Sequence, residues 1–145
     1  MTQNKVRYKT ARCILYKDNR YLLAMHNRFW AGNRRWGLPG GQIEWGESPL
    51  RAAARELEEE LEIYLPELME IGAYPYKRAM HMVFAAPLTE DIVRFDDTEL
   101  LDIGWFSEHE IAGLKSRSSL HANYELEAVR QLRARLSVTD TAAGM

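Results

Sequence analysis

GGQIEWGESPLRAAARELEEELEI, residues 40–63, decides the fold of this chain, because it joins a glycine loop to a helix with unevenly placed charges. The adjacent Gly40 and Gly41 predict a sharp bend in which backbone can approach a ligand closely. Ser48 before Pro49 predicts a helix start, since serine is a favoured N-cap and proline a favoured first residue. We expect a short strand over residues 42–45, then a turn and the helix.

The expected helix has one apolar face and two charged flanks. The apolar arc holds Leu50, Ala53, Ala54, Leu57 and Leu61. Glu56, Glu59 and Glu60 gather on one flank at spacings where like charges repel, in the half of the helix whose dipole disfavours anions. A hard cation such as Mg²⁺ prefers carboxylate oxygens and would remove this repulsion. The alternative is an ordinary solvated face rich in glutamate.

The same stretch resembles the box of the Nudix hydrolase family (MutT-like). That pattern is Gly, five residues, Glu, seven residues, then Arg-Glu-apolar-x-Glu-Glu-x-Gly-apolar. The matching residues are Gly41, Glu47, Arg55, Glu56, Leu57, Glu59, Glu60 and Ile63. The one departure is Glu62, where the family has glycine. Glutamate in a left-handed helix end costs about 1–2 kcal/mol, so either Glu62 bears that strain or the helix continues towards Pro66.

The resemblance implies a fold, a cofactor and a set of site residues. The fold is α+β, a Nudix-type α/β/α sandwich with a mixed β-sheet, and the cofactor is Mg²⁺, with Mn²⁺ as a second cation. The implied metal ligands are the carbonyl of Gly40 and the carboxylates of Glu56, Glu59 and Glu60. Arg55 and Glu47 would form an ion pair that orients the helix against the loop.

The general base has two candidates, Glu56 in the box and Glu99 in a later connector. Glu99 begins the run ELLDIGWF, which resembles the family's acidic residue before a strand ending in Trp-Phe. Glu56 lies between Glu59 and Glu60 on the charged flank, so we favour Glu56. A solvated connector residue remains the alternative for Glu99.

Substrate phosphates need cations, and the loop before the glycines carries Arg28, Arg34 and Arg35. The alternative for each of them is an ordinary basic surface loop that balances an acidic chain. Asn123 is a candidate for reading a base edge, or else an N-cap of the last helix. Nearby aromatic residues either stack on a base or pack in the core: Phe29, Trp30, Trp36, Trp45, Tyr74 and Tyr76. No downstream motif of members that act on NADH, ADP-ribose or coenzyme A is recognisable.

The whole chain of 145 residues predicts one domain, with residues 137–145 as a frayed tail. Its single cysteine, Cys13, lies in an alternating strand pattern and predicts a buried thiol. The sequence shows neither a signal-peptide pattern nor an apolar run of membrane length, so we expect a cytoplasmic protein without a membrane partner. The formal charge of −2 gives no overall attraction to nucleic acid. The short chain favours a small nucleotide as partner over a capped RNA, and a homodimer is left open.

The other expected elements follow from alternation and capping signals. Strands are expected over residues 10–16, 21–26, 67–74, 81–86 and 100–106, and a polar connector over residues 87–97. Ser107 and Glu110 form a capping box that opens a short helix. A last helix is expected from Asn123 to Leu136.

Three functional readings follow from these observations. The expected activity is Mg²⁺-dependent hydrolysis of a phosphoanhydride bond in a nucleoside diphosphate linked to another group, such as a nucleoside triphosphate or a nucleotide sugar. A catalytically silent binding or sensor module would lack a box glutamate, whereas this sequence retains them. An interaction domain with a merely solvated acidic helix leaves the glycine loop unexplained.

Overall fold

The computed structural model describes residues 7–27 and 34–143, with side chains described as far as residue 138. In chain order the first elements are β1 (Tyr8–Lys17), β2 (Arg20–His26), β3 (Trp36–Gly37), β4 (Gly40–Gln42) and α1 (Pro49–Leu61). They are followed by β5 (Met69–Tyr76), β6 (Ala79–Pro87), β7 (Leu100–Phe106), α2 (Glu108–Ser116) and α3 (Glu125–Ala143). No helix in these described residues is long and apolar enough to cross a membrane.

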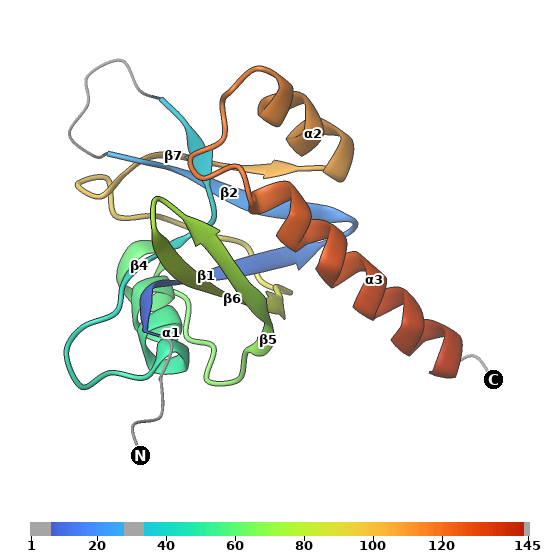
Figure 1. Cartoon of the computed structure of the whole chain (residues 1–145), viewed down its shortest axis with the longest axis horizontal. Coiled ribbons are helices and arrows are strands. Elements are labelled where there is room, and N and C mark those ends of the chain that lie inside the picture. Colours follow the sequence, from blue (N-terminus) through green and yellow to red (C-terminus); the bar gives the residue numbers. More distant parts are fainter. Residues whose placement is uncertain (1–6, 28–33, 144–145) are drawn as a thin grey trace.

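The strands form one mixed sheet in the order β3-β2-β1-β6-β5, with β4 also pairing with β1 and β7 with β2. The pair β1–β6 is parallel, and the other pairs are antiparallel. Helix α1 lies on one side of this sheet, and α2 and α3 lie on the other (Figure 1). The expected α+β sandwich with a mixed sheet is therefore confirmed.

Alternation along the strands divides the core between the two faces of the sheet. In β1, Cys13 packs on the α1 side with Leu57, whereas Ile14 packs on the α2 and α3 side with Val129. This period of two is the reason that one sheet supports helices on both faces. Cys13 is fully buried, as expected, and burial raises the pKa of its thiol well above the usual range.

The sequence signals at the helix starts correctly predicted where α1 and α2 begin. Ser48 accepts a hydrogen bond from the N–H of Arg51, and Pro49 is the first residue of α1. At α2, Ser107 and Glu110 exchange both bonds of a capping box, at 2.9 and 3.1 Å. Such contacts depend on residues within one turn of helix, so the sequence is sufficient to predict them.

Five of these expectations were wrong. The short strand expected over residues 42–45 is instead β4, because Gly40 and Gly41 pair with β1. Leu50, expected on the buried face of the helix, is 39% exposed. The last helix begins at Glu125 rather than Asn123, whose φ of 69° is not helical, and it continues past Leu136 to Ala143. Asn123 is therefore not the N-cap of α3.

Glu62 adopts the left-handed conformation that the sequence left open. Helix α1 ends at Leu61, and Glu62 has φ 55° and ψ 39°. Its N–H donates to the carbonyl of Glu58 at 3.0 Å, and the N–H of Ile63 reaches the carbonyl of Leu57 at 3.5 Å. The chain therefore leaves the helix through a residue type that tolerates this conformation poorly.

Candidate active site

The glycine loop is held against β1 by close backbone contact. Gly40 has φ 142°, and a Cβ built on it would lie 2.3 Å from the carbonyl oxygen of Ala11. A side chain at this position would therefore collide with backbone that cannot move aside. The contact brings the loop over the strand and places the N–H of Gly40 next to helix α1.

Glu60 is the inner carboxylate of the site. Its Oε1 accepts a hydrogen bond from the N–H of Gly40 at 3.0 Å, and its Oε2 lies 3.6 Å from Nδ1 of His26. Only 3% of the residue is exposed, and burial raises the pKa of the carboxyl to about 8. A buried carboxylate of this kind favours a cation beside it, because the charged form is poorly solvated.

Arg55 binds the loop and two of the site glutamates at once. Its Nε and Nη2 donate to the two carboxylate oxygens of Glu47 at 2.7 and 3.0 Å, as a fork. Its Nη1 donates to Glu56 at 3.1 Å and to Glu59 at 3.2 Å, and Nη2 also reaches the carbonyl of Gln42 at 3.1 Å. The expected pair of Arg55 and Glu47 is therefore present, and hydrogen bonding to Glu47 raises the pKa of the guanidinium.

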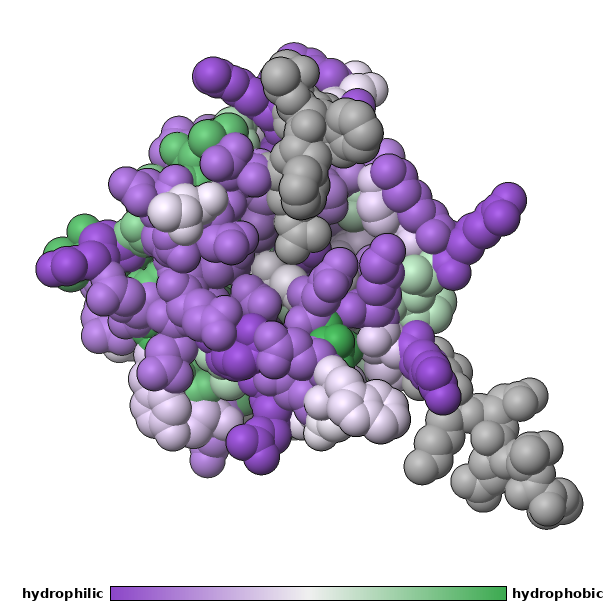
Figure 2. Space-filling model, turned by 90° about the vertical axis from the view of Figure 1, so that its left-hand side faces the viewer, coloured by the Kyte–Doolittle hydropathy of each residue, from purple (hydrophilic) through white to green (hydrophobic). Residues whose placement is uncertain are grey.

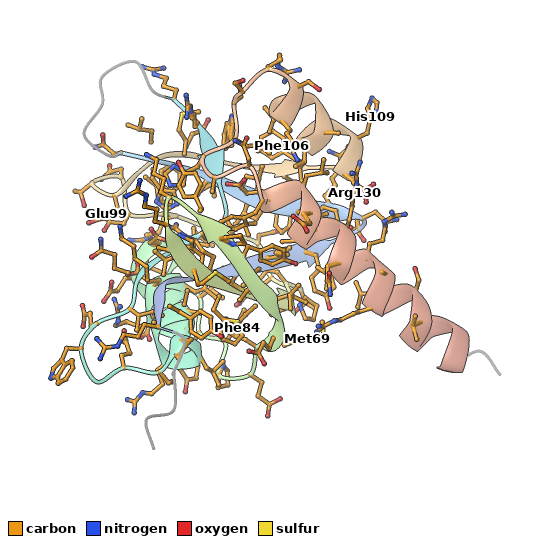
Figure 3. The ribbon with its side chains drawn as sticks, in the orientation of Figure 1. Met69, Phe84, Glu99, Phe106, His109 and Arg130 are labelled. Atoms are coloured by element: carbon orange, nitrogen blue, oxygen red, sulfur yellow. The ribbon has the colours of Figure 1, made fainter. Side chains whose placement is uncertain are left out.

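Glu56, Glu59 and Glu60 line an acidic hollow of about 490 Å³. Its lining residues are Gln42, Glu44, Glu56, Glu59, Glu60, Asp96 and Glu99. Figure 3 shows Glu99 on the same side of the molecule as α1, and Figure 2 shows that this side is predominantly hydrophilic. The hollow therefore combines the box carboxylates with two acidic residues from the segment before β7.

The chemistry of these donors fits a hard divalent cation. Among the described residues, no three or more His, Cys, Asp or Glu side chains are placed so that together they could hold a metal ion. Mg²⁺ does not require such a set of side chains, because it keeps several waters and is commonly bound by one or two carboxylates together with substrate phosphates. An open hollow lined by carboxylates suits that mode of binding.

Glu56 and Glu99 differ in their surroundings within this hollow. Glu56 is half-buried, and burial raises the pKa of its carboxyl, partly offset by the charge of Arg55. Glu99 is exposed, and its backbone is fixed by the bond from the N–H of Asn27 to its carbonyl, at 2.8 Å. Both general-base candidates nevertheless line the same hollow.

Among the described residues, none of those predicted to bind substrate lines the hollow. Arg34 and Arg35 are exposed and directly precede β3, and Asn123 is exposed just before α3. Arg28 lies outside the described residues, as do Phe29 and Trp30. Their roles in binding substrate stay predictions.

Arg12 is one residue of the site that was not expected from the sequence. It is buried in β1, and its Nη1 donates to the carbonyls of Leu38 and Gly40, each at 3.2 Å. The bond to Gly40 uses one lone pair of the carbonyl that the resemblance assigns to the metal, so a second lone pair remains available. The signal in the sequence was a charged residue at a core-facing position of an alternating strand.

Asp96 is a second residue that sequence reasoning treated only as part of a polar connector. Its backbone N–H donates to the carbonyl of Glu60 at 2.8 Å, which ties the connector to the end of α1. The hydroxyl and the N–H of Thr98 donate to its carboxylate, and these bonds lower its pKa. Spacing along the chain gave no signal for this contact.

Comparison with known proteins agrees with the geometry of the loop and helix. The NUDIX domain matches residues 6–126, which is most of the chain. The chain belongs to the NUDIX family. Among curated relatives, it is 33% identical over 109 residues to the NAD-capped RNA hydrolase NudC of Pectobacterium atrosepticum, covering 70% of this chain and 41% of that protein. The chain thus spans about two fifths of the length of the NudC relatives that it matches.

Solved NUDIX structures share the fold at low sequence identity. An Ap4A hydrolase from C. elegans superposes with a TM-score of 0.72 at 21% identity, covering 89% of this chain and 98% of that chain. The NUDIX domain of Shewanella oneidensis NrtR, complexed with ADP ribose, has a TM-score of 0.69 at 21% identity, covering 91% and 90%. These similarities show the fold of this NUDIX protein.

Proposed function

We propose that this NUDIX protein is a Mg²⁺-dependent hydrolase that cleaves a phosphoanhydride bond of a nucleoside diphosphate linked to another group. The observation that carries the proposal is that Glu56, Glu59 and Glu60 line the same hollow as Glu99. Family membership supports the same class of reaction. The names of the relatives, an NAD-capped RNA hydrolase and an Ap4A hydrolase, describe nucleotide-linked substrates of those proteins.

In this proposal Glu56, Glu59 and Glu60 hold the cation, together with the carbonyl of Gly40. When bound, Mg²⁺ neutralises phosphate charge and lowers the barrier to attack by water. Glu56 accepts the proton of the water whose oxygen bonds to phosphorus, and the bridging P–O bond breaks to leave two phosphate products. Arg55 keeps Glu56 and Glu59 in place through the contacts of its Nη1.

The small-nucleotide substrate expected from the sequence is part of the proposal, as are a cytoplasmic location and the choice of Mg²⁺ over Mn²⁺. The relatives named NudC add NAD and NAD-capped RNA to the compounds that must be compared. The sequence carries no recognisable downstream motif of members that act on NADH, ADP-ribose or coenzyme A. A direct comparison of substrates therefore has to decide between them.

The test is product release from a panel of substrates, with Mg²⁺, with Mn²⁺ and with chelator. The panel contains nucleoside triphosphates, nucleotide sugars, dinucleoside polyphosphates, NAD and NAD-capped RNA. We expect turnover that chelator abolishes and that Glu59→Gln or Glu60→Gln lowers at least 100-fold, since a metal supplies several kcal/mol of stabilisation. Turnover that survives chelation contradicts the proposal, and nucleotide binding without turnover identifies a binding module instead.

A further inference from the structure

Arg12 is a buried cation that hydrogen-bonds to backbone carbonyls of the glycine loop. It is 6% exposed, and because side chains alternate along a strand it shares with Ile14 the face of β1 towards α2 and α3. A charge at such a position destabilises a fold unless its N–H groups are hydrogen-bonded. Its Nη1 donates to the carbonyls of Leu38 and Gly40, each at 3.2 Å. The side chain therefore joins the middle of β1 to the loop that precedes helix α1.

The polar groups of Gly40 point away from β1 and need partners elsewhere. Arg12 and Gly40 are partners across the antiparallel pair of β1 and β4. At the next position along, the N–H of Cys13 donates to the carbonyl of Pro39 at 3.0 Å. Hydrogen-bonded and non-hydrogen-bonded partners alternate in an antiparallel pair, so the N–H and the carbonyl of Gly40 face away from β1. Among the described strands β4 pairs with β1 alone, and both groups therefore depend on side chains.

The backbone of the loop at this point lies between two carboxylates of the acidic hollow. Oε1 of Glu60 accepts a hydrogen bond from the N–H of Gly40 at 3.0 Å, and a Cβ built on Gly41 would lie 2.6 Å from Oε1 of Glu56. Both carboxylates line the hollow. A backbone carbonyl has two lone pairs, so Arg12 can hold one of them while the other faces a cation. The bond from Arg12 thus fixes the direction of the second lone pair.

The charge of Arg12 offers a different explanation of its place beside the hollow. Burial raises the pKa of the Glu60 carboxyl to about 8, and the charge of Arg12 acts against this rise. A guanidinium also repels a metal cation, so an arginine that acted through its charge alone would weaken metal binding. Removal of the side chain therefore has opposite effects under the two explanations: looser metal binding if the hydrogen bond matters, and tighter binding if only the charge does.

We propose that Arg12 is a positioning residue that directs the carbonyl of Gly40 towards the cation of the acidic hollow. The inference rests on the proposed function, which supplies the cation and its carboxylate ligands. Groups that orient the ligands of a metal commonly contribute about 10- to 100-fold to metal affinity or activity. Arg12 would act in this way from the strand, as Arg55 does for Glu56 and Glu59 from the helix.

The test is Mn²⁺ binding to the substrate-free protein, with free Mn²⁺ counted by electron paramagnetic resonance. Mn²⁺ is a suitable probe because it accepts the same carboxylate and carbonyl oxygens as Mg²⁺. We expect Arg12→Met, which has no donor, to bind Mn²⁺ about tenfold more weakly than the wild type. Arg12→Lys keeps the charge and a donor but lacks the planar fork, so it should recover part of the affinity. The Mn²⁺ concentration that half-saturates turnover should rise by the same factors.

Two control variants remove comparable contacts that lie away from the hollow. Arg135→Met deletes another arginine that donates to two backbone carbonyls, those of Glu70 and Ile71 in β5, neither of which lines the hollow. Thr10→Val deletes a buried hydrogen bond, at 2.7 Å to His81, on the same face of β1. We expect wild-type affinity for Mn²⁺ in both, because neither contact holds a carbonyl of the glycine loop.

The inference is overturned if folded Arg12→Met binds Mn²⁺ as tightly as the wild type or more tightly, or if Thr10→Val loses as much affinity. If Arg12→Met does not fold, Arg12→Lys decides, and wild-type affinity of that variant overturns the inference. Absence of Mn²⁺ binding by the wild type does so too. Weaker binding by the Arg12 variants, together with no turnover of any substrate in the panel, would overturn only the proposed hydrolase activity.

Discussion

The carboxylate of Glu56 lies directly against the backbone of Gly41. A Cβ built on Gly41 would be 2.6 Å from both Cδ and Oε1 of Glu56. Real atoms do not approach so closely, so any other residue at position 41 must push this carboxylate away. Glu56, a candidate general base on helix α1, can therefore keep its position only because residue 41 is a glycine.

This relationship predicts that Gly41→Ala lowers turnover at least 10-fold with only a small loss of stability. The methyl group meets the end of a flexible side chain, which moves at little cost but then leaves its place in the hollow. Gly72→Ala is the matched control, because its Cβ meets only the ring of Tyr74 at an ordinary 3.7 Å. Full activity of Gly41→Ala in a steady-state assay would show that the position of Glu56 does not matter.

The fork between Arg55 and Glu47 predicts that Arg55→Lys lowers turnover at least 10-fold although the charge is kept. Lysine cannot reach Glu47, Glu56, Glu59 and the carbonyl of Gln42 at the same time. Arg51→Lys on the exposed side of the helix is the control. If both variants behave as the wild type, charge alone explains the role of Arg55.

The two general-base candidates are separated by Glu56→Gln and Glu99→Gln, each assayed at saturating Mg²⁺. A general base contributes about 10²–10⁴-fold, and we expect the larger loss for Glu56→Gln, since its carboxylate is half-buried and held by Arg55. Glu99 is exposed at the edge of the hollow. The assignment is wrong if Glu99→Gln abolishes turnover while Glu56→Gln only weakens the response to Mg²⁺.

The left-handed conformation of Glu62 predicts that Glu62→Gly stabilises the protein by about 1 kcal/mol. The exposed ion pair with Arg94, at 3.3 Å, offsets little of this gain. Glu58→Gly is the contrast, because glycine inside the helix costs about 1 kcal/mol. Denaturant unfolding of both variants measures the two effects, and a destabilised Glu62→Gly would contradict the conformation seen here.

Glu125, the first residue of α3, predicts a pH-dependent contribution to stability. It is 1% exposed, its Oε1 has no hydrogen-bond partner among the residues that the structure describes, and burial raises the pKa of its carboxyl. The folded state then holds the proton more tightly than the unfolded state. The favourable contribution is present below the unfolded pKa and is lost as the pH rises through the folded pKa.

The test compares the free energy of unfolding of wild type and Glu125→Gln between pH 5 and pH 8. Glutamine is neutral at both values and can still accept from the N–H of Ala122. Between pH 5 and pH 8 we expect the free energy of unfolding of the variant to rise relative to that of the wild type by about 1 kcal/mol. This is the scale of the cost of an unsatisfied buried polar group. A difference that is constant with pH would show that the Glu125 carboxyl does not titrate differently in the two states.

The sequence by itself determined the elements whose causes are local. Ser48 and Pro49 mark the start of α1, the capping box at Ser107 marks the start of α2, and alternation identifies the long strands. The spacing of the box also brought three glutamates onto one flank of a helix and indicated the family. These features depend on residues within a few positions of one another, which fixed helical and strand periods relate directly.

Only the tertiary structure decided which residues meet across long separations in the chain. Arg12 reaches the carbonyl of Gly40, and Glu99 joins Glu56 in the hollow, because strand pairing and the path of the connector bring them together. It also decided that Trp36 packs in the core while Trp45 remains in solvent. Residue type and spacing do not distinguish a tryptophan that will be buried from one that will be exposed, because burial depends on what the rest of the chain places beside each side chain.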